Sequence, residues 1–248
     1  MDANLAQLTV RLSRAAYLDQ PDAATAVADL GLGGFRFFDA SSTQAFVASD
    51  ASRVFLAFRG TESDNPRDWV RDSQFATTKG ELETMVHSGF HKALDEVWTD
   101  MRPLATGGEV FLTGHSLGAG IATLAAARLA DDGATVAGVY TYGQPRTGKA
   151  DFAGAYQAAL GSKTFRFVNH IDVVTRVPFL LQGYRHVGQR MYFDGDGAFH
   201  DGASVWKVAW DDIKARLRHF GTIKAAGVGP HDMSKYVARV DALAGEAG

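Results

Sequence analysis

Residues 114–118 read Gly-His-Ser-Leu-Gly, a G-x-S-x-G pattern that is typical of a nucleophilic serine at a sharp turn. The residues before it, 109–113, are apolar and rich in strand formers, and residues 119–129 favour a helix. Between strand and helix, the glycines permit a tight turn, and the Ser116 hydroxyl is held out at the carboxyl end of the strand. The sequence therefore predicts Ser116 as a nucleophile. A serine that only caps the helix is the alternative.

A serine hydroxyl needs a general base, and the base needs an acid to orient it. In enzymes with such a turn, the acid follows the serine along the chain and the histidine comes last. Asp172 stands just after a predicted strand at 164–168, between apolar residues that would exclude water. The alternatives come from a Gly-rich segment typical of a solvated turn; they are Asp194, Asp196 and Asp201. Calcium binding by that segment would require a twelve-residue loop pattern, which is missing.

The general base is expected in the loop that opens the last predicted helix. His231 stands there, in residues 229–236, where it could reach back over the strand ends. His170 is too close to Asp172 in sequence to face it easily, and His219 lies on or beside a charged helix. His231 is therefore the preferred base. The other candidates are His170, His186, His200 and His219.

An acyl-transfer site also needs hydrogen-bond donors for the oxyanion of the tetrahedral intermediate. One donor is expected to be the backbone N–H of Leu117, the residue after the nucleophile. The second should come from a loop after an earlier strand. The strand predicted at 54–58 is followed by Arg59-Gly60-Thr61, so the N–H of Thr61 is the best candidate.

The pattern of apolar residues predicts how these parts are positioned. We expect strands at 35–38, 44–48, 54–58, 109–113, 135–142, 164–168 and 184–193, and helices at 3–18, 89–101, 117–131, 149–160, 204–217 and 232–244. The first three strands favour antiparallel hairpins. From residue 109 onward strand and helix alternate, which predicts an α/β fold with a mostly parallel sheet and helices on both faces. No linker or repeat divides the chain, so we expect one domain, 1–248.

Together, these pieces resemble the class 3 lipases, a branch of the α/β-hydrolases. The resemblance runs from about residue 10 to the last helix, and its blocks are residues 58–61, 68–72, 86–90, 113–119, 140–148, 169–174 and 231–236. It implies an α/β-hydrolase fold, a Ser116–Asp172–His231 triad and an oxyanion hole at Thr61 and Leu117. It also implies a lid at about 63–75 that carries Asp64, Trp69 and Val70, and it implies no metal or cofactor.

Composition excludes several other classes of function. The chain has 248 residues, with 25 Lys and Arg against 28 Asp and Glu, so no basic field points to nucleic acid. No apolar run is long enough to cross a membrane. With no cysteine, disulfides and thiol catalysis are excluded. The first residues show no signal-peptide pattern, so we expect a cytoplasmic protein or the mature form of a secreted one.

The prediction is a serine carboxylester hydrolase that acts on acylglycerols or other carboxylic esters. A phospholipase or another acyl-transfer enzyme could use the same triad. A catalytically inactive lipid-binding module on the same scaffold is the alternative outside enzymes, because fold alone does not imply activity. The apolar residues 179–181 are expected either to line an acyl pocket or to pack in the core. The mostly polar lid argues against strong activation at an oil–water interface, so contact with a lipid surface is expected to be transient.

Overall fold

The structure is a computed structural model that describes residues 1–60, 76–202 and 229–247. Its main strands are β1 (Gly33–Ala40), β2 (Thr43–Ser49), β3 (Arg53–Phe58), β6 (Glu109–His115), β7 (Val136–Tyr142), β8 (Thr164–Asn169), β9 (Gln189–Phe193) and β10 (Phe199–Asp201). Its helices are α1 (Ala3–Ala15), α2 (Gln20–Asp29), α4 (Ser88–Met101), α5 (Leu117–Asp131), α6 (Ala150–Leu160) and α8 (Met233–Ala247). The short strands β4 (Thr77–Lys79) and β5 (Met85–His87) form a separate hairpin.

The main sheet has the strand order β1-β2-β3-β6-β7-β8-β9-β10. Strands β3, β6, β7, β8 and β9 run parallel to one another, whereas β1–β2, β2–β3 and β9–β10 pair antiparallel. The carboxyl ends of the parallel strands therefore meet at one edge of the sheet. This is where open α/β sheets place their ligand sites.

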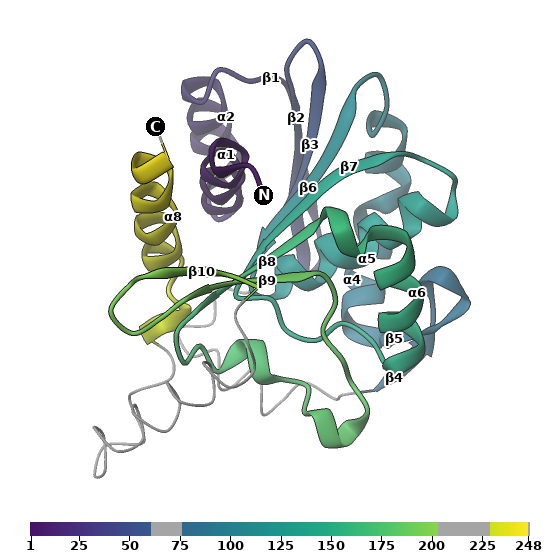
Figure 1. The fold of residues 1–248 in the computed structure, drawn as a ribbon. Helices are drawn as coiled ribbons and strands as arrows, with labels where there is room; N and C mark the ends of the chain where they lie inside the picture. The colour runs from purple at the N-terminus through teal and green to yellow at the C-terminus, as the bar shows by residue number, and fades with distance from the viewer. Residues whose placement is uncertain (61–75, 203–228, 248) are drawn as a thin grey trace.

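Helices cover both faces of the sheet, with α1, α2 and α8 on one side and α4, α5 and α6 on the other (Figure 1). Successive residues of a strand point to opposite faces. In β6, Phe111 packs into the cluster that contains Val10 and Val240, and Leu112 packs into the cluster that contains Leu94 and Leu124. Because both faces of β6 are buried, its sequence is a continuous apolar run and does not alternate between apolar and polar residues. The predicted mostly parallel sheet, with antiparallel strands near the N-terminus, is confirmed.

Several elements differ from the sequence prediction. Of the strand expected at 184–193, only the second half forms, as β9. Gly188, just before β9, takes a left-handed conformation with a φ of 72°, which ends the extended backbone there. Helix α2 was not predicted, since only Ala23 and Val27 of its residues are buried and its amphipathic pattern is weak. The short strands β4, β5 and β10 were also missed. The helix expected at 204–217 lies outside the described residues.

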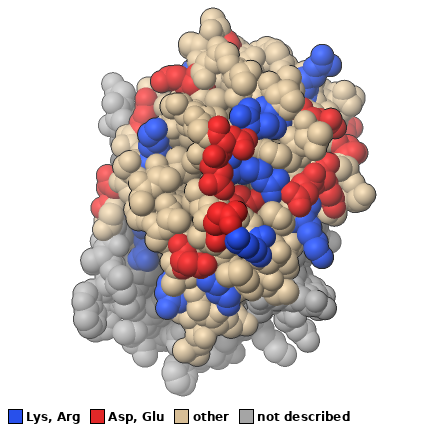
Figure 2. Space-filling view, turned by 90° about the vertical axis from the view of Figure 1, so that its right-hand side faces the viewer, with Lys and Arg blue, Asp and Glu red and all other residues tan. Residues whose placement is uncertain are grey.

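Charges of both signs alternate over the face covered by α4, α5 and α6 (Figure 2). Arg128 of α5 binds Glu81 and also Asp95 of α4, which links two elements across this face. Such a mixed surface does not create the single-sign field that attracts nucleic acid. Among the residues that the structure describes, no helix is both long enough and apolar enough to span a lipid bilayer.

Candidate functional site

Ser116 lies at the junction between β6 and α5 in a conformation that is unusual for a residue with a side chain. Its φ is 59° and its ψ is −126°, whereas helix α5 begins at the next residue. Non-glycine residues with positive φ cost energy and cluster at functional sites. The turn is fixed because the Ser116 N–H donates to the carbonyl oxygen of Tyr142 in β7, over 3.0 Å.

Helix α5 begins directly against the end of β3. A Cβ added at Gly118 would lie 2.1 Å from the carbonyl oxygen of Phe58, so only glycine permits this approach. Leu117 is the first residue of α5, and the N–H groups of a first turn have no partner within the helix. Leu117 and Gly60 line the same cavity of about 240 Å³ together with residues 39–44 and Arg59. The loop that follows β3 is thus adjacent to the N-terminus of α5.

Asp172 and His231 form a buried hydrogen-bonded pair. Asp172 is fully buried in the loop after β8, and His231, 4% exposed, precedes α8. The His231 Nδ1 atom lies 2.8 Å from Asp172 Oδ2. The same oxygen accepts a hydrogen bond from the Tyr236 hydroxyl at 2.6 Å, and Oδ1 accepts one from the Val174 N–H at 2.9 Å. Three donors therefore hold the Asp172 carboxylate in one orientation.

This pairing determines the tautomer of His231. A carboxylate only accepts hydrogen bonds, so Nδ1 carries a proton, and in the neutral imidazole Nε2 keeps a lone pair. Nε2 is buried and has no hydrogen-bond partner among the described residues, Ser116 included. In enzymes without substrate, the hydrogen bond between nucleophile and base is often long and tightens when substrate binds. In the neutral form of His231, Nε2 is therefore an acceptor with no partner among the described residues.

His115 connects the Ser116 turn to the His231 loop. Its ring stacks on the His231 ring, with centroids 4.5 Å apart. Its Nε2–H donates to the His231 carbonyl oxygen at 2.8 Å, and its Nδ1 lies 2.8 Å from the Tyr17 hydroxyl. From β8, the Asn169 side chain donates to the carbonyl oxygen of Pro230 at 2.8 Å. Side chains of β6 and β8 therefore fix the loop before α8 by hydrogen bonds to its backbone carbonyl oxygens.

Burial, together with the neighbouring His231, lowers the pKa of His115 to about 3. An unfolded chain takes up a proton on this histidine below about pH 6.5, whereas the folded chain does not until about pH 3. Acidification therefore favours unfolding in that window, by up to about 1.4 kcal/mol per pH unit from this residue.

We expect a His115→Gln variant to lose this part of the pH dependence of the unfolding free energy. Its amide N–H can still donate to the His231 carbonyl oxygen. Urea unfolding at pH 7, 6 and 5 measures the dependence in both proteins. Equal slopes of unfolding free energy against pH would contradict the prediction.

Gly143, which follows β7, leaves space for the pair. Its φ is 60°, and a Cβ there would lie 2.8 Å from His231 Cε1 and 3.0 Å from Asp172 Oδ2. Any side chain at this position would strain the backbone and displace the imidazole. The loops after β6, β7 and β8 thus all contribute to one packed site.

The alternative acid and base candidates that the structure describes lie elsewhere, and His219 lies outside the described residues. Asp194 and His200 pair with each other at 2.8 Å, between β9 and the edge strand β10. Asp194 Oδ1 also accepts from the Asp196 and Ala198 N–H groups, as expected of a turn. Asp201 ends β10, and His186 binds the carbonyl oxygen of Thr175. Among the described residues, no group of three or more acidic or histidine side chains could hold a metal ion.

The comparisons with known proteins agree on one family. The class 3 lipase family matches residues 55–182. The chain is 31% identical over 217 residues to the secreted mono- and diacylglycerol lipase A of Penicillium cyclopium, a match that covers 77% of this chain and 70% of that protein. It is also 33% identical over 160 residues to the secreted mono- and diacylglycerol lipase 1 of Fusarium solani. That match covers 61% of this chain but only 47% of the Fusarium protein.

A solved triacylglycerol lipase, described as having a serine protease triad at its catalytic centre, superimposes with a TM-score of 0.68. It is 26% identical, and the match covers 80% of this chain and 82% of that one. The chain belongs to the class 3 lipase family. Its α/β-hydrolase fold is the one that the resemblance implied.

For this class 3 lipase, sequence reasoning located the acid–histidine pair but not the groups around it. The structure brings Asp172 and His231 into contact and places Leu117 at the helix start. Tyr236 was noted only as part of a terminal pattern, and its hydrogen bond to Asp172 was missed. The stacking role of His115 was missed as well, because nothing local in the sequence indicates it. The remaining predicted residues, Thr61, Asp64, Trp69 and Val70, lie outside the described residues.

Proposed function

We propose that this class 3 lipase is a serine carboxylester hydrolase whose triad is Ser116, Asp172 and His231. The observation that carries the proposal is the buried Asp172–His231 pair, which His115 holds against the strained Ser116 turn. In this pair Nε2 of His231 has no partner in the part of the chain that the structure describes. A capping serine would require neither the strain nor a buried imidazole of fixed tautomer. An acid that binds Nδ1 of the base is the orienting contact that such a triad requires, and this contact supports the proposal.

In the proposed reaction, Ser116 Oγ attacks the ester carbonyl while His231 Nε2 takes its proton. The N–H of Leu117, with that of Thr61, stabilises the oxyanion. His231 then protonates the leaving alcohol, and water repeats the cycle on the acyl-enzyme. Asp172 keeps Nδ1 protonated and stabilises the imidazolium, and the Tyr236 hydroxyl keeps the carboxylate in place.

Lipid esters are the proposed substrates because the matched fungal relatives are named as mono- and diacylglycerol lipases. The chain spans about half the length of the Fusarium enzyme and 70% of the Penicillium one. Both relatives are also named as secreted. This supports the mature form of a secreted protein over a cytoplasmic location.

An exposed apolar tip supports contact with a lipid surface. Phe179, Leu180 and Leu181 follow the acid loop directly, and their exposed fractions are 53%, 55% and 101%. Of the two expectations for these residues, packing in the core was wrong, because all three are exposed. A short helical turn begins at Leu180. Exposed clusters of large apolar side chains mark interaction sites. We propose that this tip, residues 179–181, touches the lipid while ester enters the site.

Replacing one leucine of the tip tests this contact. Leu181→Asp should lower the rate on emulsified triglyceride about tenfold, because burying a leucine side chain contributes roughly 1.5–3 kcal/mol when it is complete. Hydrolysis of soluble p-nitrophenyl butyrate should not change.

The matched control is Leu104→Asp, at an exposed leucine in the connection between α4 and the amino end of β6. Equal loss of emulsion activity in both variants would disprove a specific role for the tip.

The overall function is tested with p-nitrophenyl esters of graded chain length, assayed with and without emulsified triglyceride. Turnover of any ester, together with labelling by a fluorophosphonate probe, supports the hydrolase. A well-folded protein that binds lipid vesicles without turnover or labelling would instead be the inactive lipid-binding module. Faster hydrolysis of phospholipids than of acylglycerols would mean that the substrate is a phospholipid, while the proposed triad would stay the same.

A further inference from the structure

Strands β8 and β9 place two arginines directly opposite each other. Arg166 and Arg190 are register partners in this parallel pair, so both side chains lie on the same face of the sheet. Phe167 and Met191 point to the other face, where they belong to the apolar core. Arg166 is only 3% exposed. Like charges directly opposite each other destabilise a sheet unless something compensates them.

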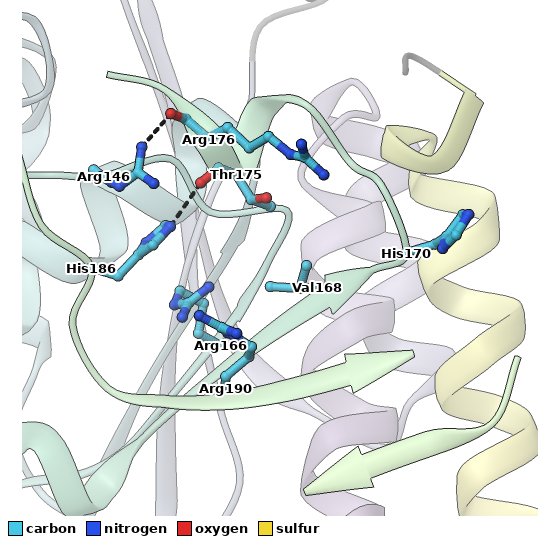
Figure 3. Close-up of a pocket in the computed structure, with 8 residues that line it drawn as sticks. All are labelled: Arg146, Arg166, Val168, His170, Thr175, Arg176, His186 and Arg190. Atoms are coloured by element: carbon cyan, nitrogen blue, oxygen red, sulfur yellow. Dashed lines mark hydrogen bonds between the residues drawn. The ribbon is translucent and has the colours of Figure 1, made fainter. Parts of the chain in front are cut away.

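Two further arginines, Arg146 and Arg176, join the pair at a cavity of about 200 Å³, which we call the arginine cavity. Its described lining is Arg146, Arg166, Val168, His170, Thr175, Arg176, His186 and Arg190, with no Asp or Glu among them. Figure 3 shows Arg166 and Arg190 next to each other, Arg146 and His186 on one side of them, and His170 set apart. None of Ser116, Asp172 and His231 lines this cavity.

Two observations indicate that positive charge here is uncompensated by the described residues. Burial, and then the neighbouring arginines, lower the pKa of Arg166 to about 9 and that of Arg146 to about 10. The buried Nε of Arg146 has no hydrogen-bond partner among the described residues. Buried cations are normally paired, so the cavity has the chemistry of an anion site.

His186 indicates which anion would fit. Its Nε2 lies 2.7 Å from the carbonyl oxygen of Thr175, which can only accept, so Nε2 carries the proton. Nδ1 is then an acceptor, and it is buried with no partner among the described residues. An anion in contact with both groups would accept from the arginines and donate to His186. Monohydrogen phosphate has both properties, whereas sulfate and carboxylates are only acceptors at neutral pH.

We propose that the arginine cavity binds a monohydrogen phosphate group, with Arg146, Arg166 and Arg190 around its oxygens and His186 accepting from its hydroxyl. The group could come from inorganic phosphate or from a phosphomonoester lipid such as phosphatidate. Arg146 also donates to the carbonyl oxygens of Arg176 and Pro178, in the loop that begins at Asp172. A bound phosphate would therefore brace the loop that carries the proposed catalytic acid. The site itself does not depend on ester hydrolysis.

Thermal unfolding of the full chain tests the site with inorganic phosphate as the probe. At about 100 times the dissociation constant, phosphate should raise Tm by roughly 5–10 °C over chloride of equal ionic strength. Sulfate and acetate should raise it less. An unchanged Tm in phosphate, or an equal rise with sulfate, would overturn the proposal.

Variants of Arg190 make the test specific. Arg190→Glu places a carboxylate beside Arg166, so Tm without phosphate should rise and the response to phosphate should disappear. Arg190→Gln removes one positive charge but adds no negative one, so the rise of Tm with phosphate should be smaller than in the wild type. Arg36→Glu, at an exposed arginine of β1, is the matched control and should respond like the wild type. A normal phosphate response in Arg190→Glu would overturn the proposal.

Vesicles distinguish the two sources of phosphate. If the phosphate is carried by lipid, the wild type should sediment with vesicles of phosphatidylcholine and phosphatidate, and Arg190→Glu should sediment less. If the ligand is the free anion, only the Tm response should depend on Arg190. Either pattern supports the site. A wild type whose Tm does not respond to phosphate contradicts it, whatever the vesicles show.

Discussion

Replacing Ser116 by alanine is expected to lower kcat for ester hydrolysis by about a million-fold, if the three proposed residues act as a unit. Without the hydroxyl no acyl-enzyme forms, and Nε2 of His231 has no nucleophile to activate. The proposed donors at Leu117 and Thr61 would support only weak catalysis by water. Initial rates with p-nitrophenyl butyrate measure the loss, and a fluorophosphonate probe should label the wild type but not the variant.

The matched control is Ser88→Ala. Ser88 stands at another strand–helix junction, between β5 and α4, so its loss tests for a general effect on folding. Both variants should unfold at temperatures near that of the wild type. A folded Ser116→Ala protein with near-native turnover would exclude Ser116 as the nucleophile.

Asp172→Asn is expected to lower kcat/KM about ten-thousandfold. The new amide can donate to His231 Nδ1, which shifts the imidazole proton to Nε2 and removes the acceptor that the serine needs. The amide also carries no charge to stabilise the imidazolium. Because the carboxylate accepts from Val174, His231 and Tyr236, some loss of stability is expected too, and unfolding in urea should be measured beside the rates.

Asp194→Asn provides an internal comparison, because Asp194 also binds a histidine, His200, at the same 2.8 Å separation. The two substitutions make the same chemical change in two aspartate–histidine pairs, and only one pair lies beside the Ser116 turn. Asp194→Asn should keep near-native kcat/KM. The reverse result would mean that the acid has been assigned to the wrong pair.

Much of the candidate site was predictable because its signals are local. The Ser116 turn is encoded by an apolar strand, glycines and a helix-forming segment within about 20 residues. Asp172 and His231 were selected by chain order and by their places at element ends. The contacts between them were not predictable, since the stacking of His115 on His231 joins residues that are distant in sequence and depends on where α8 packs.

The missed elements share a different cause. Strand β10 exists only because its three residues pair with β9 at the sheet edge, and its composition alone does not favour a strand. The tip at 179–181 is apolar yet exposed, and the usual rule that apolar residues are inside gave the wrong answer there. The pairing of Arg166 with Arg190 depends on strand register, which hydrophobic periodicity does not determine across a crossover connection.

The packing of α8 on α1 has a consequence for the time at which the protein becomes active. Gln7 and Arg11 of α1 both bind Asp241 of α8, and His231 stands just before that last helix. During synthesis on the ribosome, the sheet and the serine turn emerge well before the imidazole that we propose as their base. With the proposed triad, a nascent chain hydrolyses esters only after α8 has docked against α1.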